Sequence, residues 1–184
     1  MKKYKIIYAD PAWVYENKLE YHGGGAESHY ICTPTEEMGE IPIPAEKDSI
    51  CLMWCTYPKL PEGLKLMALW GFEYRTVAFT WVKKYRGKNK FFFGMGKYTR
   101  ANPEVCLLGR RGKGVPRVSA SVPNLQIHTI GAHSAKPEAI KLEIIKLFGD
   151  VSRIELFSRT KQEAWDVWGN EAPKEEQKIL KEDS

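Results

Sequence analysis

A carboxylate and an aromatic ring stand side by side where the first apolar run of the chain ends. The run covers residues 5–9 and is followed directly by Asp10-Pro11-Ala12-Trp13. An exocyclic amine on a flat base is a poor nucleophile, because its lone pair is delocalised into the ring. A carboxylate oxygen and a main-chain carbonyl that accept its two N–H bonds would stabilise the charge that develops on nitrogen during transfer. The Trp13 ring would hold such a base outside its stack, although on residue types alone an ordinary Asp-Pro turn is the more common interpretation.

A strongly basic stretch with interleaved aromatic residues is the second feature that suggests chemistry. Residues 83–117 contain eleven Lys or Arg and a single acid, Glu104, so they carry +10 in a chain whose net charge is +5. A positive segment with aromatic rings suits a phosphate backbone and bases that stack on the rings. We therefore expect nucleic-acid contacts from its first half, with a solvated loop as the alternative. The residues expected to make these contacts are Lys83, Lys84, Arg86, Lys88, Lys90, Lys97 and Arg100.

The composition excludes several other classes of protein. The 184 residues suffice for one globular domain, and 43% hydrophobic residues with 12% aromatics argue against disorder. No apolar run reaches the roughly 18 residues of a membrane-spanning helix, and the start of the chain lacks a signal peptide's apolar stretch. We therefore expect a cytoplasmic protein without membrane contact. The four cysteines and four histidines lack the spacing of a zinc site, so no metal is expected.

Apolar runs and helical periodicities alternate along the chain. Short apolar runs predict strands over residues 5–9, 49–55, 75–82, 104–108, 153–157 and 164–168. Apolar residues at helical spacing predict helices over residues 33–39, 60–70 and 136–148, the last opening at Lys136-Pro137. This order predicts an α/β domain with a mostly parallel sheet and helices on both faces. In such folds ligands lie beyond the carboxyl ends of the strands, which is where Asp10 stands.

Landmarks over nearly the whole chain resemble the MT-A70 family of N6-adenine methyltransferases, in family order. Asp10-Pro11-Ala12-Trp13 is similar to the family's Asp-Pro-Pro-Trp signature, with alanine in place of the second proline. Alanine keeps the Pro11 carbonyl but gives up ring packing and some stiffness of the loop. The other landmarks are residues 25–30 (GAESHY), 52–54 (LMW), 70–72 (WGF), 81–83 (WVK), 102–109 (NPEVCLLG), 133–137 (HSAKP), 155–159 (ELFSR) and 165–171 (WDVWGNE).

The resemblance implies a fold and a set of roles. The fold is a Rossmann-like S-adenosylmethionine-dependent methyltransferase domain over residues 1–171, with the catalytic motif before the cofactor motif and a charged tail over 172–184. The resemblance makes Asp10, Pro11, Ala12 and Trp13 catalytic. It assigns S-adenosylmethionine to Asp10, Ser134, Lys136, Glu155, Phe157, Arg159, Asn170 and Glu171, with Lys136 on the methionyl carboxylate.

The activity that the resemblance implies is methyl transfer to the N6 amine of adenine in nucleic acid. The compact organisation of the chain resembles the bacterial and phage branch of the family, which favours DNA over RNA as the substrate. The alternatives are RNA methylation and a catalytically silent nucleic-acid-binding subunit of the same fold, while a homodimer or a partner subunit is left open. Asp10 and Lys136 favour an active enzyme, because a silent subunit has little reason to keep both.

Overall fold

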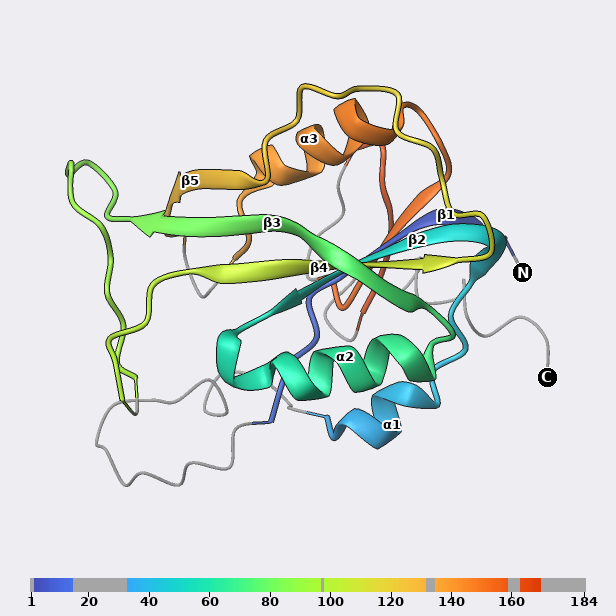
Figure 1. The fold of residues 1–184 in the computed structure, drawn as a ribbon, viewed down its shortest axis with the longest axis horizontal. Coiled ribbons are helices and arrows are strands. Elements are labelled where there is room, and N and C mark those ends of the chain that lie inside the picture. The colour runs from blue at the N-terminus through green and yellow to red at the C-terminus, as the bar shows by residue number, and fades with distance from the viewer. Residues whose placement is uncertain (1, 15–32, 97, 132–134, 159–162, 170–184) are drawn as a thin grey trace.

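One twisted sheet forms the centre of the molecule (Figure 1). The computed structural model describes residues 2–14, 33–96, 98–131, 135–158 and 163–169. Within these residues the strands are β1 (Tyr4–Ala9), β2 (Ala45–Cys55), β3 (Glu73–Lys84), β4 (Glu104–Arg111), β5 (Leu125–Thr129), β6 (Arg153–Leu156) and β7 (Asp166–Trp168). The helices are α1 (Thr35–Gly39), α2 (Leu60–Leu69) and α3 (Glu138–Phe148), with a 3₁₀ turn over Tyr57–Lys59 before α2.

The strands lie in the order β5-β3-β4-β2-β1-β6-β7. Four of the six pairings between the described strands are parallel, and β4 alone runs antiparallel to both of its neighbours. The expected α/β fold with a mostly parallel sheet is therefore confirmed. Because β4 is reversed, its first residue lies at the same edge as the carboxyl ends of β2 and β3.

Hydrophobic cores on both faces explain why the central strands are apolar throughout. On β1, Ile7 and Ala9 point into one core, whereas Ile6 and Tyr8 point into the other. The same alternation runs along β2, and strands buried on both faces read as continuous apolar runs. Helices α1 and α2 cover the first core and α3 covers the second, so the expected helices on both faces are confirmed (Figure 1).

Strand β5 was not expected from the sequence. Its polar side chain Gln126 points inward, while Leu125 and Ile127 are about half exposed at the edge of the sheet. This reverses the usual pattern of apolar residues facing in and polar residues facing out, so the alternation gives no signal for a half-buried strand.

Helix α3 begins at Glu138, two residues later than expected. Pro137 is the N-cap in an extended conformation, with φ −61° and ψ 125°, so Lys136 precedes the helix rather than lying in its first turn. Residues 172–184, expected as a charged tail, lie outside the described residues. No helix of the described part is long and apolar enough to span a membrane.

Candidate active site

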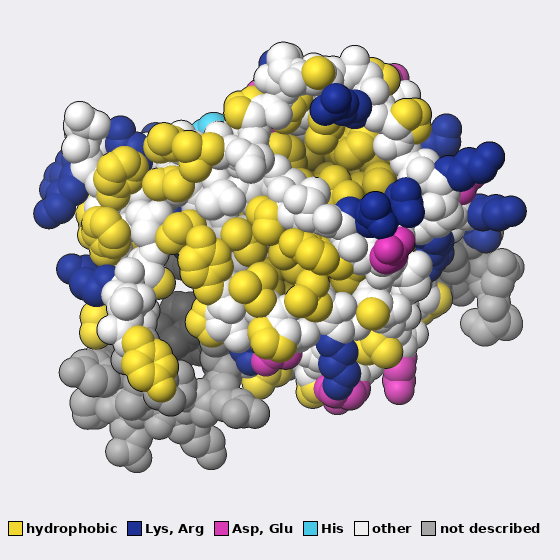
Figure 2. Space-filling view, viewed as in Figure 1, with side chains coloured by type: hydrophobic (Ala, Val, Ile, Leu, Met, Phe, Trp, Pro, Cys, Tyr) yellow, Lys and Arg dark blue, Asp and Glu magenta, His cyan; other side chains and the backbone are white. Residues whose placement is uncertain are grey.

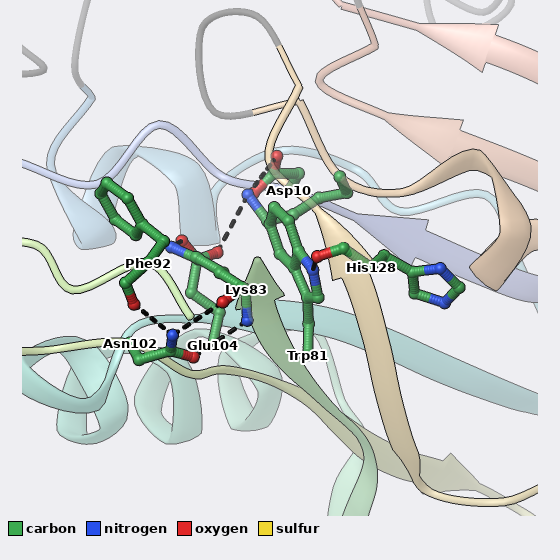
Figure 3. Close-up of polar contacts among 8 residues, drawn as sticks. Asp10, Trp81, Lys83, Phe92, Asn102, Glu104 and His128 are labelled. Atoms are coloured by element: carbon green, nitrogen blue, oxygen red, sulfur yellow. Dashed lines mark hydrogen bonds and ion pairs between the residues drawn. The ribbon is translucent and has the colours of Figure 1, made fainter. Parts of the chain in front are cut away.

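Four charged side chains of alternating sign form one chain of contacts at the carboxyl edge of the sheet (Figure 3). Lys136 Nζ donates to Asp10 Oδ2 at 2.8 Å and lies 3.2 Å from Glu104 Oε2. The other oxygen of Glu104 accepts from Lys83 Nζ at 2.6 Å. The Asp10 carboxylate is therefore linked through Lys136 and Glu104 to Lys83, and two acids balance two bases.

The order of the strands brings these residues together. Asp10 directly follows β1, whose last residue, Ala9, is aligned with Met53 on β2. Glu104 opens β4 and is aligned with Trp81 near the end of β3. Lys136 comes from the connection between β5 and α3. The expectation that ligand-binding groups gather beyond the carboxyl ends of the strands fits this geometry.

The charges shift the pKa values of the cluster in opposite directions. Burial by itself raises the pKa of Glu104, but Lys136 and Lys83 lower it by more, so the net pKa lies below its ordinary value. Burial by itself lowers the pKa of Lys136, but Asp10 and Glu104 raise it by more, so the net pKa lies above its ordinary value. Each group therefore stabilises the charged form of its partner at neutral pH.

Buried aromatic residues hold the Asp10-Pro11-Ala12-Trp13 segment in place. The Trp13 indole is 6% exposed, and its Nε1 donates to the Trp54 carbonyl at 3.2 Å. Trp54 Nε1 in turn donates to the Tyr8 hydroxyl at 2.6 Å. The Trp13 main-chain N–H donates to the Pro11 carbonyl at 3.0 Å, which leaves that oxygen a second lone pair for another donor. In this arrangement Trp13 positions the segment, and its ring is too buried to stack on a base without moving.

Glu155 on β6 is tied to its surroundings by two hydrogen bonds. Its Oε2 accepts from Lys141 Nζ on α3 at 2.7 Å and from Ser158 Oγ at 3.0 Å. Burial is the largest influence and raises its pKa, although Lys141 and Ser158 oppose the rise. Glu155 thus joins α3 to the turn that follows β6.

That turn contains a residue in an unusual backbone conformation. Phe157 has a φ of 62°, in the left-handed region that non-glycine residues rarely adopt. Its ring stacks on Trp70 with centroids 6.2 Å apart and meets Trp168 edge-on at 5.9 Å. Strained residues held by surrounding packing cluster at ligand sites, which supports a role for Phe157 in binding.

The other predicted site residues divide into two groups. Ser134, Arg159, Asn170, Glu171 and Lys97 lie outside the described residues. Arg86, Lys88, Lys90 and Arg100 lie on the connection between β3 and β4, and Lys84 is the last residue of β3. Lys83 differs from these, because its ammonium is mostly buried and bonded to Glu104. We therefore place Lys83 in the charged cluster rather than among the phosphate contacts.

Asn102 and Glu104 were not predicted as site residues. The Asn102 side chain is buried and bridges the chain: Oδ1 accepts from the Lys83 N–H, and Nδ2 donates to the carbonyls of Lys83 and Phe92 (Figure 3). A signal for Glu104 was present, since it is the single acid between residues 83 and 117. Asn102 opens the family landmark of residues 102–109, but its role was not predicted because its partners are main-chain groups brought near by the turn.

Comparison with known proteins supports the family resemblance seen in the sequence. Residues 4–171 match the MT-A70 family. The chain is 35% identical to the Type II methyltransferase M.MunI of Mycoplasma sp, over 94% of this chain and 79% of that protein. It is 28% identical to the N(6)-adenosine-methyltransferase MT-A70-like protein of Drosophila melanogaster and 26% identical to the N(6)-adenosine-methyltransferase catalytic subunit METTL3 of Homo sapiens. These two alignments cover 92% of this chain but only 27% and 28% of the relatives' lengths.

Proposed function

The chain belongs to the MT-A70 family of methyltransferases, and we propose that it methylates the N6 amino group of adenine in DNA. The proposal rests above all on one observation, the Asp10 carboxylate held at 2.8 Å from Lys136 at the carboxyl end of β1. This fixed acceptor stands next to the Pro11 carbonyl in a segment anchored by buried tryptophans.

The adenine amine needs two acceptors, and the segment offers both. Lys136 does not saturate Asp10, because a carboxylate has about four acceptor sites on two oxygens. The Asp10 carboxylate would accept one amine N–H and the Pro11 carbonyl the other, which favours a pyramidal nitrogen with an available lone pair. As positive charge develops on that nitrogen, the negative Asp10 stabilises it, and this interaction strengthens in the transition state. The proton released after transfer would leave by way of Asp10.

S-adenosylmethionine, the cofactor of this family, supplies the electrophilic methyl group when it is bound. Its methionyl end carries a carboxylate and an ammonium, and the Lys136–Asp10 pair presents one charge of each sign at this edge. The residues therefore fit that end of the cofactor, with Lys136 toward the carboxylate and Asp10 toward the ammonium. By the family resemblance, Ser134, Arg159, Asn170 and Glu171 complete the site, and Glu155 and Phe157 flank the sugar.

DNA is favoured over RNA by the distribution of the relatives. The chain aligns with 79% of a bacterial Type II methyltransferase, but with only about a quarter of the animal adenosine methyltransferases. We propose accordingly that the protein acts in the cytoplasm of a bacterial or phage-infected cell. A silent binding subunit is disfavoured by the retained Asp10–Lys136 pair.

Nucleoside mass spectrometry of cells that express the chain tests activity and substrate class together. We expect N6-methyladenine in the DNA of these cells and none above background in cells expressing Asp10→Ala. N6-methyladenosine confined to RNA would replace DNA by RNA as the substrate. Unmodified DNA and RNA, together with no transfer to oligonucleotides by the purified protein, would contradict the enzymatic function.

A further inference from the structure

Residues 84–101, which comprise the last residue of β3 and most of its connection to β4, extend from the sheet as a long arm (Figure 1). We call this segment the arm. It contains six Lys or Arg and no Asp or Glu. Both of its ends adjoin the charged cluster, because Lys83 precedes it and Glu104 follows it closely. A strand of nucleic acid bound along the arm would therefore lead toward Asp10.

Main-chain hydrogen bonds fix the base of the arm, where Lys84 and Phe91 form an isolated antiparallel bridge. The Phe92 N–H donates to the Lys83 carbonyl at 2.9 Å, and the Gly94 N–H donates to the Ala101 carbonyl at 2.7 Å. The Asn102 side-chain amide also donates to the Phe92 carbonyl. The backbone around residues 91–94 is therefore fixed relative to the charged cluster.

Side chains along this extended segment alternate between inward and outward positions. Phe92 is partly buried and meets Tyr85 edge-on, with ring centroids 5.5 Å apart. Phe91, Phe93 and Met95 point outward and are 45%, 43% and 88% exposed. Figure 2 shows hydrophobic and basic side chains next to one another at this end of the molecule. Phe91, Phe93 and Met95 therefore form an exposed apolar row, and contiguous exposed apolar patches mark interaction sites.

The spacing and charge of the outward row suit the bases of a nucleic-acid strand. Alternate side chains on an extended segment lie about 6.6 Å apart, close to twice the base-stacking distance of about 3.4 Å. Each ring can therefore stack on a base of one strand. Lys84 Nζ lies over the Phe91 ring, 5.9 Å from its centroid, and the Arg100 guanidinium lies over the Phe93 ring, 6.0 Å from its centroid. One face of each ring thus has a cation over it, which can meet a phosphate, and a base would stack on the opposite face.

We propose that Phe91 and Phe93 form a stacking platform for unpaired bases next to the target adenine. This proposal rests on the nucleic-acid substrate proposed above and names its strandedness, because only unpaired bases offer their faces to the rings. The uniformly positive charge of the arm favours a polyanion over a protein as the partner. The arm would hold the strand while the target base enters the site beside Asp10.

Binding measured without cofactor tests the proposal independently of catalysis. The probe is a single-stranded oligodeoxynucleotide of about 12 nucleotides carrying one 2-aminopurine, compared with its duplex. Phe91→Leu/Phe93→Leu keeps the apolar bulk but removes both aromatic faces. We expect its affinity for the single strand to fall about 5- to 100-fold per stacked base. We also expect less change of 2-aminopurine fluorescence and an unchanged slope of affinity against salt.

Two matched variants separate stacking from charge. Lys88→Gln/Lys90→Gln should lower the magnitude of the salt slope by about 1.4, because each lost phosphate contact contributes about 0.7 on a single strand. Tyr74→Leu, which removes an aromatic side chain 44% exposed at the other end of β3, should leave binding unchanged. Wild-type affinity in the phenylalanine variant, or an equal loss for single strand and duplex, would overturn the proposal. Altered sedimentation of that variant with unaltered oligonucleotide binding would instead identify the row as a protein interface.

Discussion

The Lys136 ammonium lies 2.8 Å from Asp10 Oδ2, although 126 residues separate the two in the chain. The same ammonium reaches Glu104, so one cation holds two carboxylates at the carboxyl edge of the sheet. The acid proposed to act on the substrate amine is thus oriented by the base proposed to bind the cofactor. Substitutions in this cluster should therefore affect cofactor binding, methyl transfer and stability to different degrees.

Asp10→Asn should impair methyl transfer most and Lys136→Met should impair cofactor binding most, although both residues face the methionyl end of the cofactor. Asp10→Asn removes the negative charge that stabilises the transition state, so kcat should fall by about 100-fold or more. Lys136→Met removes a charged hydrogen bond, which should weaken S-adenosylmethionine binding by about 10- to 100-fold. Calorimetric titration of cofactor and single-turnover transfer measure the two effects. Equal losses in both assays for both variants would contradict this division of roles.

Removal of the Glu104 charge should destabilise the protein more than removal of an acid from an exposed ion pair. Glu104→Gln leaves Lys83 and Lys136 as neighbouring buried cations, and breaking a buried pair costs about 3 kcal/mol or more. Lys83→Met/Glu104→Gln should be less destabilised than the sum of the single variants, which a urea double-mutant cycle measures. The exposed pair Lys65–Glu36 provides the control, where the same substitutions should change stability by less than about 1 kcal/mol.

The depressed pKa of Glu104 predicts the acid dependence of stability. An acid whose pKa is lower in the folded state contributes stability above its unfolded pKa, near the ordinary value of 4.5. This contribution disappears as the pH falls through the lower pKa of the folded state. Below about pH 4.5 the wild type should therefore lose unfolding free energy more steeply than Glu104→Gln. Urea unfolding at several pH values measures this. If the unfolding free energies of the two proteins fell in parallel, Glu104 would not be the cause of the acid sensitivity.

The raised pKa of Lys136 predicts the opposite behaviour in base. A lysine whose pKa is higher in the folded state contributes stability below its unfolded pKa, near 10.5, and loses it as the pH rises further. The cluster therefore contributes fully between about pH 4.5 and 10.5. Lys136→Met should unfold with a shallower dependence on pH above this range than the wild type. The same slope in both proteins would contradict the assignment.

Restoration of proline at position 12 should stabilise the catalytic segment. Ala12→Pro converts Asp-Pro-Ala-Trp to the family's signature and reduces the freedom of the unfolded chain, so the unfolding free energy should rise by about 0.4–1 kcal/mol. The Pro11 carbonyl is retained, so transfer should continue at a similar or higher rate. Thermal unfolding and a transfer assay measure both. A marked loss of stability would show that the backbone at position 12 does not accept proline.

Local patterns in the sequence were enough to predict several elements, the family and two residues of the site. Continuous apolar runs predicted the central strands, periodicity predicted α2 and α3, and the order of landmarks predicted the family before any contact was known. Asp10 and Lys136 were identified in the same way, since each belongs to a short motif at the end of an element. Strand β5 was not predicted because the side chain that it buries, Gln126, is polar.

The pairing of the charged side chains depends on the order and direction of the strands. Lys83 looked like one more base in a positive stretch, and its pairing with Glu104 follows from the reversed strand β4 lying beside β3. Arg110 and Arg111, in the same stretch, end β4 at the opposite edge of the sheet. Strand order and direction are set by packing between distant segments, which no local periodicity records. The site therefore consists of residues that were largely visible in the sequence, in an arrangement that only the fold defines.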